Sequence, residues 1–324
     1  MGLEAWLDKQ LDHYQESLKT TGHRLKQSLF ETLEAESPAD IGWALDTPEH
    51  KLTRNKTLEY WHIYTSNLGT SEMLPHALKN DIFVYIPGLF TQWYPGYMKD
   101  LISAMKAMRM MTHFVKINTA GSMKENALVV YNDIMNLTER YPNRKFVILG
   151  HSKGALDAAT AFVLHPELIP KVSAFIAFQS PWGGSAIAND ILSAHHRRSV
   201  SSAFVEKVLN GNSHSLVGVM HAERRKWIKQ HPFPLGAIPT ISVTTYETSF
   251  KSLLKAPIDY VKIRYNELSD GCVATKDAII PGTTVVEIPG LDHFGPAYHG
   301  FPACCDNHDP TRVQMALLHV LFHQ

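Results

Sequence analysis

Between residues 56 and 324, short apolar runs alternate with longer segments whose apolar positions recur every three or four residues. The runs are apolar at nearly every position, which is typical of strands buried on both faces of a parallel sheet. The pattern predicts an α/β fold with a mostly parallel sheet and helices on both faces. The stretch 259–266 fits either a strand or the end of a helix. Strands are expected at 58–65, 81–88, 112–118, 145–150, 172–178, 238–247 and 283–290, and helices at 97–111, 124–140, from 153 onward and at 310–322.

Two regions depart from the alternation of strand and helix. In residues 1–55 an apolar stripe that begins at Leu3, Leu7 and Leu11 predicts an N-terminal helical appendage, followed by a proline-containing linker. In residues 185–238 the strands stop and two helical segments follow, which predicts a cap or lid inserted into the body. We therefore expect an appendage at 1–55 and one α/β domain at 56–324 that carries this insertion.

Composition and charge narrow the classes of function. The 324 residues are 44% hydrophobic, enough for a substantial core, and Lys plus Arg equals Asp plus Glu at 31 each, so the mean charge gives no reason to expect nucleic acid. The charged N-terminus does not resemble a secretory signal, and no long apolar stretch predicts a membrane span. A cytoplasmic location is expected. The three cysteines, Cys272, Cys304 and Cys305, form no disulfide framework, and we expect no metal or cofactor.

The most informative stretch is Gly150-His151-Ser152-Lys153-Gly154, which lies between a buried strand and an alanine-rich helix. A serine hydroxyl is a weak nucleophile unless it is exposed, held rigidly and placed beside a base. A tight strand-to-helix turn exposes and holds the serine, but it needs very small residues two positions before and after it. This context predicts the nucleophile elbow G-x-S-x-G, with Ser152 as nucleophile.

The elbow requires an acid and then a histidine, each in a loop after a late strand. Asp270 in "SDGCV" and His293 in "GLDHFG" satisfy that order, and Asp270 would orient His293 while His293 takes the proton of Ser152. The rival residues are predicted to have structural roles: His151, His299, Asp277 and Asp292.

The developing oxyanion also needs two backbone donors. The first is expected at the start of the helix after the elbow, from the N–H of Lys153. The second is expected from the N–H of Leu89, in the loop after the strand at 81–88.

These motifs resemble those of the α/β-hydrolase superfamily, and within it the lipase and esterase branch. The stretch "GHSKGA" looks like that branch's elbow, and "SPWGGSAIAND" is similar to a stretch of bacterial triacylglycerol lipases. The sequence departs from the family pattern at Pro87, Ala155 and Trp182. The resemblance implies hydrolysis of a carboxylic ester through an acyl-enzyme, and it fixes neither the acyl chain nor the alcohol.

Aromatic residues near these motifs are candidates for contact with a substrate. Phe90 and Trp93 follow the oxyanion strand, and Trp182 follows the strand after the elbow; core packing is the competing interpretation. In the insertion, we expect the cations Arg224, Arg225 and Lys226 to face water or an anionic head group.

The leading hypothesis is a serine hydrolase of the lipase or esterase type that acts on a small ester or lipid. Cleavage of a thioester or a phospholipid by the same triad is the nearest alternative, and peripheral membrane contact is compatible with it. A binding protein that retains the scaffold without catalysis is the alternative from another class. The oligomeric state is left open by the sequence.

Overall fold

A computed structural model of the chain describes residues 39–89, 91, 96–197, 214–250, 252, 254–297 and 308–323. The centre of the fold is a sheet of seven strands in the order β1-β7-β6-β5-β4-β2-β3, and every neighbouring pair is parallel. This confirms the predicted parallel sheet. The strands are β1 (Arg54–Asn55), β2 (Ile82–Ile86), β3 (Met111–Phe114), β4 (Phe146–His151), β5 (Val172–Phe178), β6 (Thr240–Tyr246) and β7 (Thr284–Pro289).

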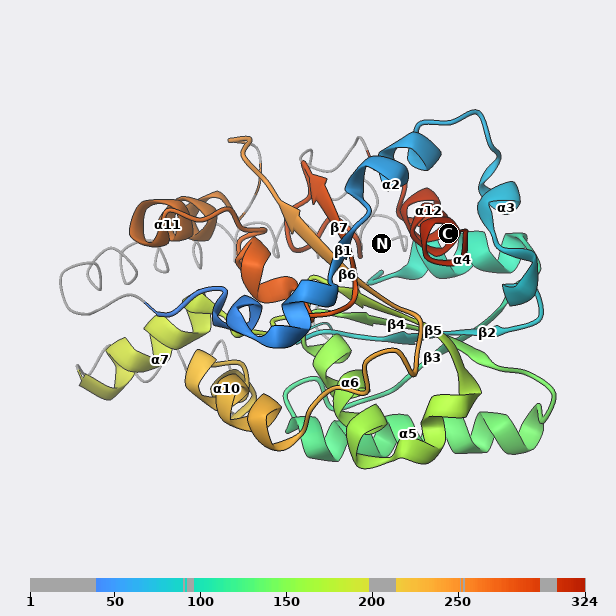
Figure 1. Ribbon diagram of the computed structural model, residues 1–324, viewed down its shortest axis with the longest axis horizontal. Helices are drawn as coiled ribbons and strands as arrows, with labels where there is room; N and C mark the ends of the chain where they lie inside the picture. Colours follow the sequence, from blue (N-terminus) through green and yellow to red (C-terminus); the bar gives the residue numbers. More distant parts are fainter. Residues whose placement is uncertain are drawn as a thin grey trace, which may run out of the picture.

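Helices cover both faces of the sheet (Figure 1). One face packs against α5 (Met123–Arg140) and α6 (Lys153–Leu164), and the other against α2 (Thr57–Tyr64), α4 (Lys99–Ala107) and α12 (Pro310–Phe322). Successive strand residues point to opposite faces. In β2, Phe83 and Tyr85 join the core beside α4 and α12, whereas Val84 and Ile86 join the core beside α5 and α6. The strands are therefore apolar throughout, as the sequence pattern predicted.

One segment has a different secondary structure from the one predicted, and another fits one of the two structures that its pattern allows. The segment 58–65, expected as a strand, forms α2, because Tyr60 and Tyr64 lie one turn apart and pack inward while Leu58 is 83% exposed. The stretch 259–266, whose pattern fits either a strand or the end of a helix, lies mostly in α11 (Lys255–Tyr265). Strand β1 is too short and polar to be recognised from the sequence. Its two residues pair with β7 at the edge of the sheet.

The predicted insertion is helical where the structure describes it. It contains α7 (Ala186–Arg197), α9 (His214–Val217) and α10 (His221–Gln230), and the candidate helix at 203–209 lies outside the described residues. Helices α7 and α10 lie toward the lower left of Figure 1, and α7 contacts α11. Buried polar contacts anchor both: Asp190 of α7 accepts from the hydroxyl of Tyr260 at 2.6 Å, and His221 of α10 lies 2.8 Å from Asp277.

Only residues 39–55 of the predicted N-terminal appendage are described. They contain the short turns η1 (Trp43–Asp46) and η2 (Pro48–Leu52) and then enter the sheet through β1. The buried indole of Trp43 donates from Nε1 to the carbonyl of Gly183 at 2.7 Å. The proposed division into an appendage at 1–55 and a body at 56–324 stays a prediction. Among the described residues, no helix has both the length and the apolar character that crossing a bilayer requires.

Candidate active site

The elbow around Ser152 has the sharp geometry that its glycines require. Strand β4 ends at His151 and α6 begins at Lys153, so Ser152 alone makes the turn, with φ 56° and ψ −129°. A Cβ on Gly150 would lie 2.5 Å from the Cα of Ala155, and one on Gly154 would lie 2.4 Å from the carbonyl oxygen of Ile86. Both contacts are too short for any side chain. The strained backbone persists because the surrounding packing over-determines it.

The structure brings Ser152, His293 and Asp270 together in one hydrogen-bonded series. His293 Nε2 lies 2.9 Å from Ser152 Oγ, and His293 Nδ1 lies 2.8 Å from Asp270 Oδ2. All three side chains are buried, with 8%, 7% and 1% of the surface of Ser152, His293 and Asp270 exposed. The residues come from three loops at the carboxyl edge of the parallel sheet, after β4, β7 and β6. The ordered arrangement predicted from the sequence is therefore present as geometry.

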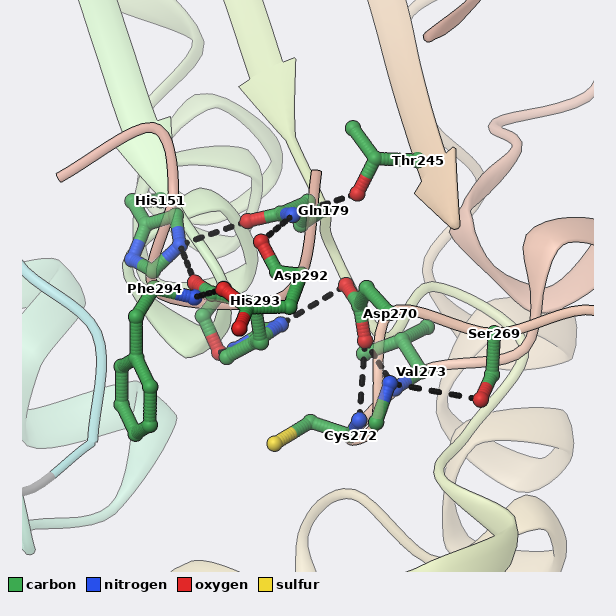
Figure 2. Close-up of polar contacts among 12 residues, drawn as sticks. His151, Gln179, Thr245, Ser269, Asp270, Cys272, Val273, Asp292, His293 and Phe294 are labelled. Carbon is green, nitrogen blue, oxygen red and sulfur yellow. Dashed lines mark hydrogen bonds and ion pairs between the residues drawn. The ribbon is translucent and has the colours of Figure 1, made fainter. Parts of the chain in front are cut away.

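The loop around Asp270 fixes the orientation of its carboxylate (Figure 2). Its Oδ1 accepts from the backbone N–H groups of Cys272 and Val273, each at 2.8 Å, which leaves Oδ2 to face His293. The backbone N–H of His293 in turn donates to the carbonyl of Asp270 at 2.8 Å. Burial, followed by the charges of Asp270 and Asp292, raises the pKa of the Cys272 thiol well above its ordinary value, so this neighbour stays protonated.

The backbone groups expected to face an oxyanion lie close to the nucleophile. A Cβ on Gly88 would come within 2.8 Å of the Cβ of Ser152, so the loop that carries Leu89 passes directly over the serine. Lys153 is the first residue of α6, where backbone N–H groups have no partner inside the helix. Among the described residues, neither the N–H of Leu89 nor that of Lys153 has a hydrogen-bond acceptor. Both donors are thus available to a substrate oxygen.

The side chain of Lys153 points away from the nucleophile into a buried cluster. Its Nζ lies 2.9 and 3.0 Å from the two carboxylate oxygens of Asp157, one turn along α6, and Asn126 donates to the same carboxylate at 2.9 Å. Burial raises the pKa of Asp157 to about 6, although Lys153 and Asn126 oppose that shift. The cluster braces the start of α6, and it holds the side chain of Lys153 but not its backbone N–H.

The rival acids and bases have other partners. His151 contacts Tyr97 and Gln179, and Asp277 accepts from the N–H of Gly42 and lies beside His221. Asp292 accepts from the N–H groups of the two residues that follow His293 and from the hydroxyl of Ser252. It organises the loop that carries His293. The remaining rival, His299, lies outside the described residues.

The predicted substrate contacts have a different outcome. Phe90 and Trp93 lie outside the described residues. The indole of Trp182 is 3% exposed and packs between the Phe233 ring, at 5.7 Å, and the guanidinium of Arg224, at 5.3 Å. This position assigns Trp182 to the junction of insertion and body, because the ring has almost no free surface.

The expectation that Arg224 faces water or an anionic group is wrong. Its side chain is 1% exposed and Nε donates to the carbonyl of Trp182 at 3.0 Å. Burial lowers its pKa to about 9, which still leaves it charged at neutral pH. Arg225 is half-exposed and pairs with Asp40, while Lys226 is exposed. Of the three cations, only Lys226 is both exposed and unpaired in the described part of the chain.

Three polar residues around the site were not identified from the sequence: Tyr97, Gln179 and Thr245. Gln179 directly follows β5, which pairs with the elbow strand β4, and Thr245 lies near the end of β6, one strand further along the sheet. A polar side chain at the end of an otherwise apolar strand is the signal that points to them. Among the described residues, no three His, Cys, Asp or Glu side chains gather as a metal site would require.

Comparisons with known proteins identify the fold. No family model and no curated protein matches the sequence. Among solved structures, a metagenomic carboxyl esterase superposes with a TM-score of 0.61 at 20% identity, over 77% of each chain. The mature form of the Bacillus licheniformis lipase BlEst2 superposes with a TM-score of 0.56 at 19% identity, over 68% of this chain and 87% of the lipase. The Legionella pneumophila phospholipase PlaB gives 0.52 at 12% identity, over 74% of this chain and 59% of the phospholipase.

The parallel sheet, the strand-to-helix elbow and these superpositions define the class: the chain has the α/β-hydrolase fold. At these identities the likeness establishes the fold alone. The predicted fold class is therefore confirmed, and the chemistry has to be argued from the site itself.

Proposed function

We propose that the protein is a serine hydrolase that cleaves carboxylic esters, with Ser152, His293 and Asp270 as its catalytic triad. One observation carries the proposal: the hydroxyl, the imidazole and the carboxylate form an unbroken series with heavy-atom separations of 2.9 and 2.8 Å. A base within hydrogen-bond reach of the nucleophile, itself oriented by a third group, is the arrangement that activates a serine.

In the first half-reaction, Ser152 Oγ attacks the ester carbonyl carbon while His293 Nε2 takes its proton. The carbonyl oxygen gains the negative charge, and the N–H groups of Leu89 and Lys153 stabilise it. Asp270 stabilises the imidazolium that forms. Collapse of the tetrahedral intermediate breaks the bond to the alkoxide, which leaves as an alcohol with the proton from His293. The acyl group remains on Ser152.

In the second half-reaction, water replaces the alcohol. His293 removes a proton from the water as its oxygen attacks the acyl carbon, and the same two N–H groups hold the oxyanion. The bond to Ser152 Oγ then breaks, and the proton returns from His293 to the serine. The acid is released and the enzyme is restored, with no cofactor required in either half.

A carboxylic ester is favoured over a substrate with a phosphate head group. A phosphate group would have to be bound by the cations of α10. Arg224 is not free to do this because it is buried, and Arg225 is paired with Asp40. A thioester or a phospholipid would react by the same steps. A panel of short and long acyl esters, an acyl-CoA and a phospholipid ranks these substrates directly.

The test of the proposal is Ser152→Ala in the purified full chain. Hydrolysis of p-nitrophenyl esters and labelling by a fluorophosphonate are both expected to be lost, with the circular dichroism spectrum unchanged. The control is Ser103→Ala, because Ser103 is an exposed serine on α4. Hydrolysis that survives Ser152→Ala would refute the proposal. So would a folded wild type that neither hydrolyses any ester nor takes the label, and that outcome would favour a binding protein.

A further inference from the structure

A second series of hydrogen bonds runs behind the triad, across the carboxyl ends of β4, β5 and β6 (Figure 2). His151 Nε2 lies 2.9 Å from Gln179 Oε1 and 3.1 Å from the carbonyl oxygen of His293. Gln179 Nε2 donates to the carbonyl of Asp292 at 2.9 Å and to the hydroxyl of Thr245. Two neighbouring carbonyls in the loop of the base are therefore bound from the strand ends.

The same series reaches the oxyanion loop on its other side. His151 Nδ1 lies 2.7 Å from the hydroxyl of Tyr97, and that hydroxyl accepts from the N–H of Gly88 at 3.3 Å. Gly88 immediately precedes Leu89, whose N–H is a proposed oxyanion donor. The ring of His151 thus stands between the loop that holds the oxyanion and the loop that holds the base.

The contacts of His151 indicate where the protons in this series lie. His151 is buried, and desolvation, with repulsion from His293 as the next cause, lowers its pKa to about 3, so the ring is neutral at neutral pH and carries a single N–H. Nε2 faces two oxygen acceptors, so the proton is on Nε2. Nδ1 then accepts from the hydroxyl of Tyr97. Burial raises the pKa of Tyr97 above its ordinary value, which keeps that hydroxyl protonated as a donor.

The backbone at Gln179 supports a role beyond packing. Gln179 has a φ of 50°, in the left-handed region that residues other than glycine rarely adopt, and it is fully buried. Its backbone N–H donates to the carbonyl of Val243 at 2.8 Å, and its side chain bonds in three directions. Such strain is retained where the position of a side chain matters.

We infer that Tyr97, His151 and Gln179 are positioning residues that fix the oxyanion loop and the base loop relative to Ser152. The inference rests on the proposed ester hydrolysis and extends it to residues that touch neither substrate nor the reacting atoms. Every hydrogen bond in the series donates in the same direction. The N–H of Gly88 donates to Tyr97, Tyr97 to His151, and His151 to Gln179 and the carbonyl of His293. Gln179 then donates to the carbonyl of Asp292. A change at either end therefore alters the other end.

Tyr97→Phe is the sharpest test, because it removes one hydroxyl and leaves the ring. Without the hydroxyl, Nδ1 of His151 is left as a buried acceptor with no donor, and the N–H of Gly88 loses the oxygen that accepts from it. We expect kcat on a p-nitrophenyl ester to fall about three- to tenfold with KM nearly unchanged. The matched control is Tyr85→Phe, which removes a buried hydroxyl that bonds Gln314 elsewhere on the sheet.

A double-mutant cycle tests whether the residues act as one series. Gln179→Met is expected to cost a similar factor, and the double variant Tyr97→Phe with Gln179→Met should lose little more than the worse single variant. Fully additive losses would overturn the inference. So would a Tyr97→Phe enzyme whose kcat matches that of Tyr85→Phe.

A measurement that needs no turnover separates this inference from the proposed function. In the ¹⁵N spectrum of the full chain labelled at histidine, His151 should appear neutral with its proton on Nε2, and Tyr97→Phe should move the Nδ1 resonance, because that nitrogen loses its hydrogen bond. A wild-type His151 protonated on Nδ1 overturns the series, even if Ser152→Ala abolishes hydrolysis as proposed. Conversely, the expected tautomer in a protein without any esterase activity would support the series as geometry and overturn its catalytic purpose.

Discussion

Asp270 divides the two oxygens of its carboxylate between His293 and its own loop. Oδ2 lies 2.8 Å from His293 Nδ1, and Oδ1 accepts two backbone N–H groups, also at 2.8 Å. Two N–H groups point at the Oδ1 position, so only a hydrogen-bond acceptor such as an oxygen fits there. The carboxylate therefore cannot rotate without losing both of them, and His293 is held in the tautomer that presents a bare Nε2 to Ser152.

Asp270→Asn should therefore switch the imidazole of His293 to its other tautomer. The loop keeps the amide oxygen at the Oδ1 position, so the amide NH₂ faces His293 Nδ1. The ring proton is then forced onto Nε2, and Nε2 can no longer accept from the hydroxyl of Ser152. We expect kcat to fall by roughly 10³- to 10⁴-fold with the fold intact. Steady-state kinetics measure this, with Asp259→Asn on α11 as the control. A loss below about tenfold would exclude Asp270 as the orienting acid.

The buried neutral His151 makes stability depend on pH. Its pKa is lowered to about 3 in the folded protein, against an ordinary value of 6.5, so the unfolded chain binds the additional proton between those values. Stability is complete above about pH 6.5 and falls as the pH drops toward 3, by up to about 1.4 kcal/mol per pH unit from this group.

His151→Gln should remove that contribution. Urea unfolding of the variant between pH 6.5 and 4 is expected to show a shallower decline than the wild type, and the exposed His62→Gln should leave the slope unchanged. Equal slopes for wild type and His151→Gln would show that His151 titrates normally in the folded state.

The pair of Lys153 and Asp157 should be sensitive to the loss of one partner and tolerant of the loss of both. Lys153→Met leaves a buried carboxylate without its cation, and we expect the free energy of unfolding to fall by about 3 kcal/mol. The double variant Lys153→Met with Asp157→Leu should recover most of that loss, since apolar replacement of a buried pair is often neutral.

Activity provides the second readout for this pair. Because the proposed oxyanion donor is the backbone N–H of Lys153 and not its side chain, the double variant should hydrolyse esters within about threefold of the wild type. Chemical unfolding and steady-state kinetics on the same preparations measure both effects. A stable double variant without activity would mean that the ammonium group itself acts in the reaction.

Substitutions of Arg224 and Lys226, two residues of α10, should differ in their effect on the free energy of unfolding. Arg224 is buried against Trp182, so Arg224→Gln should lower the free energy of unfolding by about 2–3 kcal/mol through lost packing and an unsatisfied carbonyl. Lys226→Gln, at an exposed position, should change it by less than about 0.5 kcal/mol. Thermal unfolding compares the two, and similar small shifts for both would contradict the buried position of Arg224.

The parts of the fold that could be read from the sequence are those set by local pattern. Continuous apolar runs identify buried parallel strands, and the glycines around Ser152 reflect a turn whose contacts are as short as 2.4 Å. The segment 58–65 is a helix although its aromatic and β-branched residues favour a strand, so the strand prediction was wrong there. The inward spacing of Tyr60, Ile63 and Tyr64 was the helical signal, and packing on α12 decides in its favour.

The order of Ser152, Asp270 and His293 could be predicted because the elbow demands it. The series through Tyr97, His151 and Gln179 could not, because it depends on which strand ends are neighbours, and strand order is a property of the folded sheet. Arg224 was misplaced for a related reason. A cation in a helical segment is normally predicted to face solvent. The Trp182 ring that packs on Arg224 comes from a distant part of the chain, so the sequence does not indicate that Arg224 is buried.

The nucleophile lies 141 positions ahead of its imidazole partner in the chain. During synthesis the elbow emerges from the ribosome long before β7 and the loop that follows it. Throughout that interval the growing polypeptide carries only an ordinary alcohol. On the proposed mechanism, hydrolysis becomes possible only once the loop that carries His293 has folded, so a translation product that stops short of position 293 would lack it.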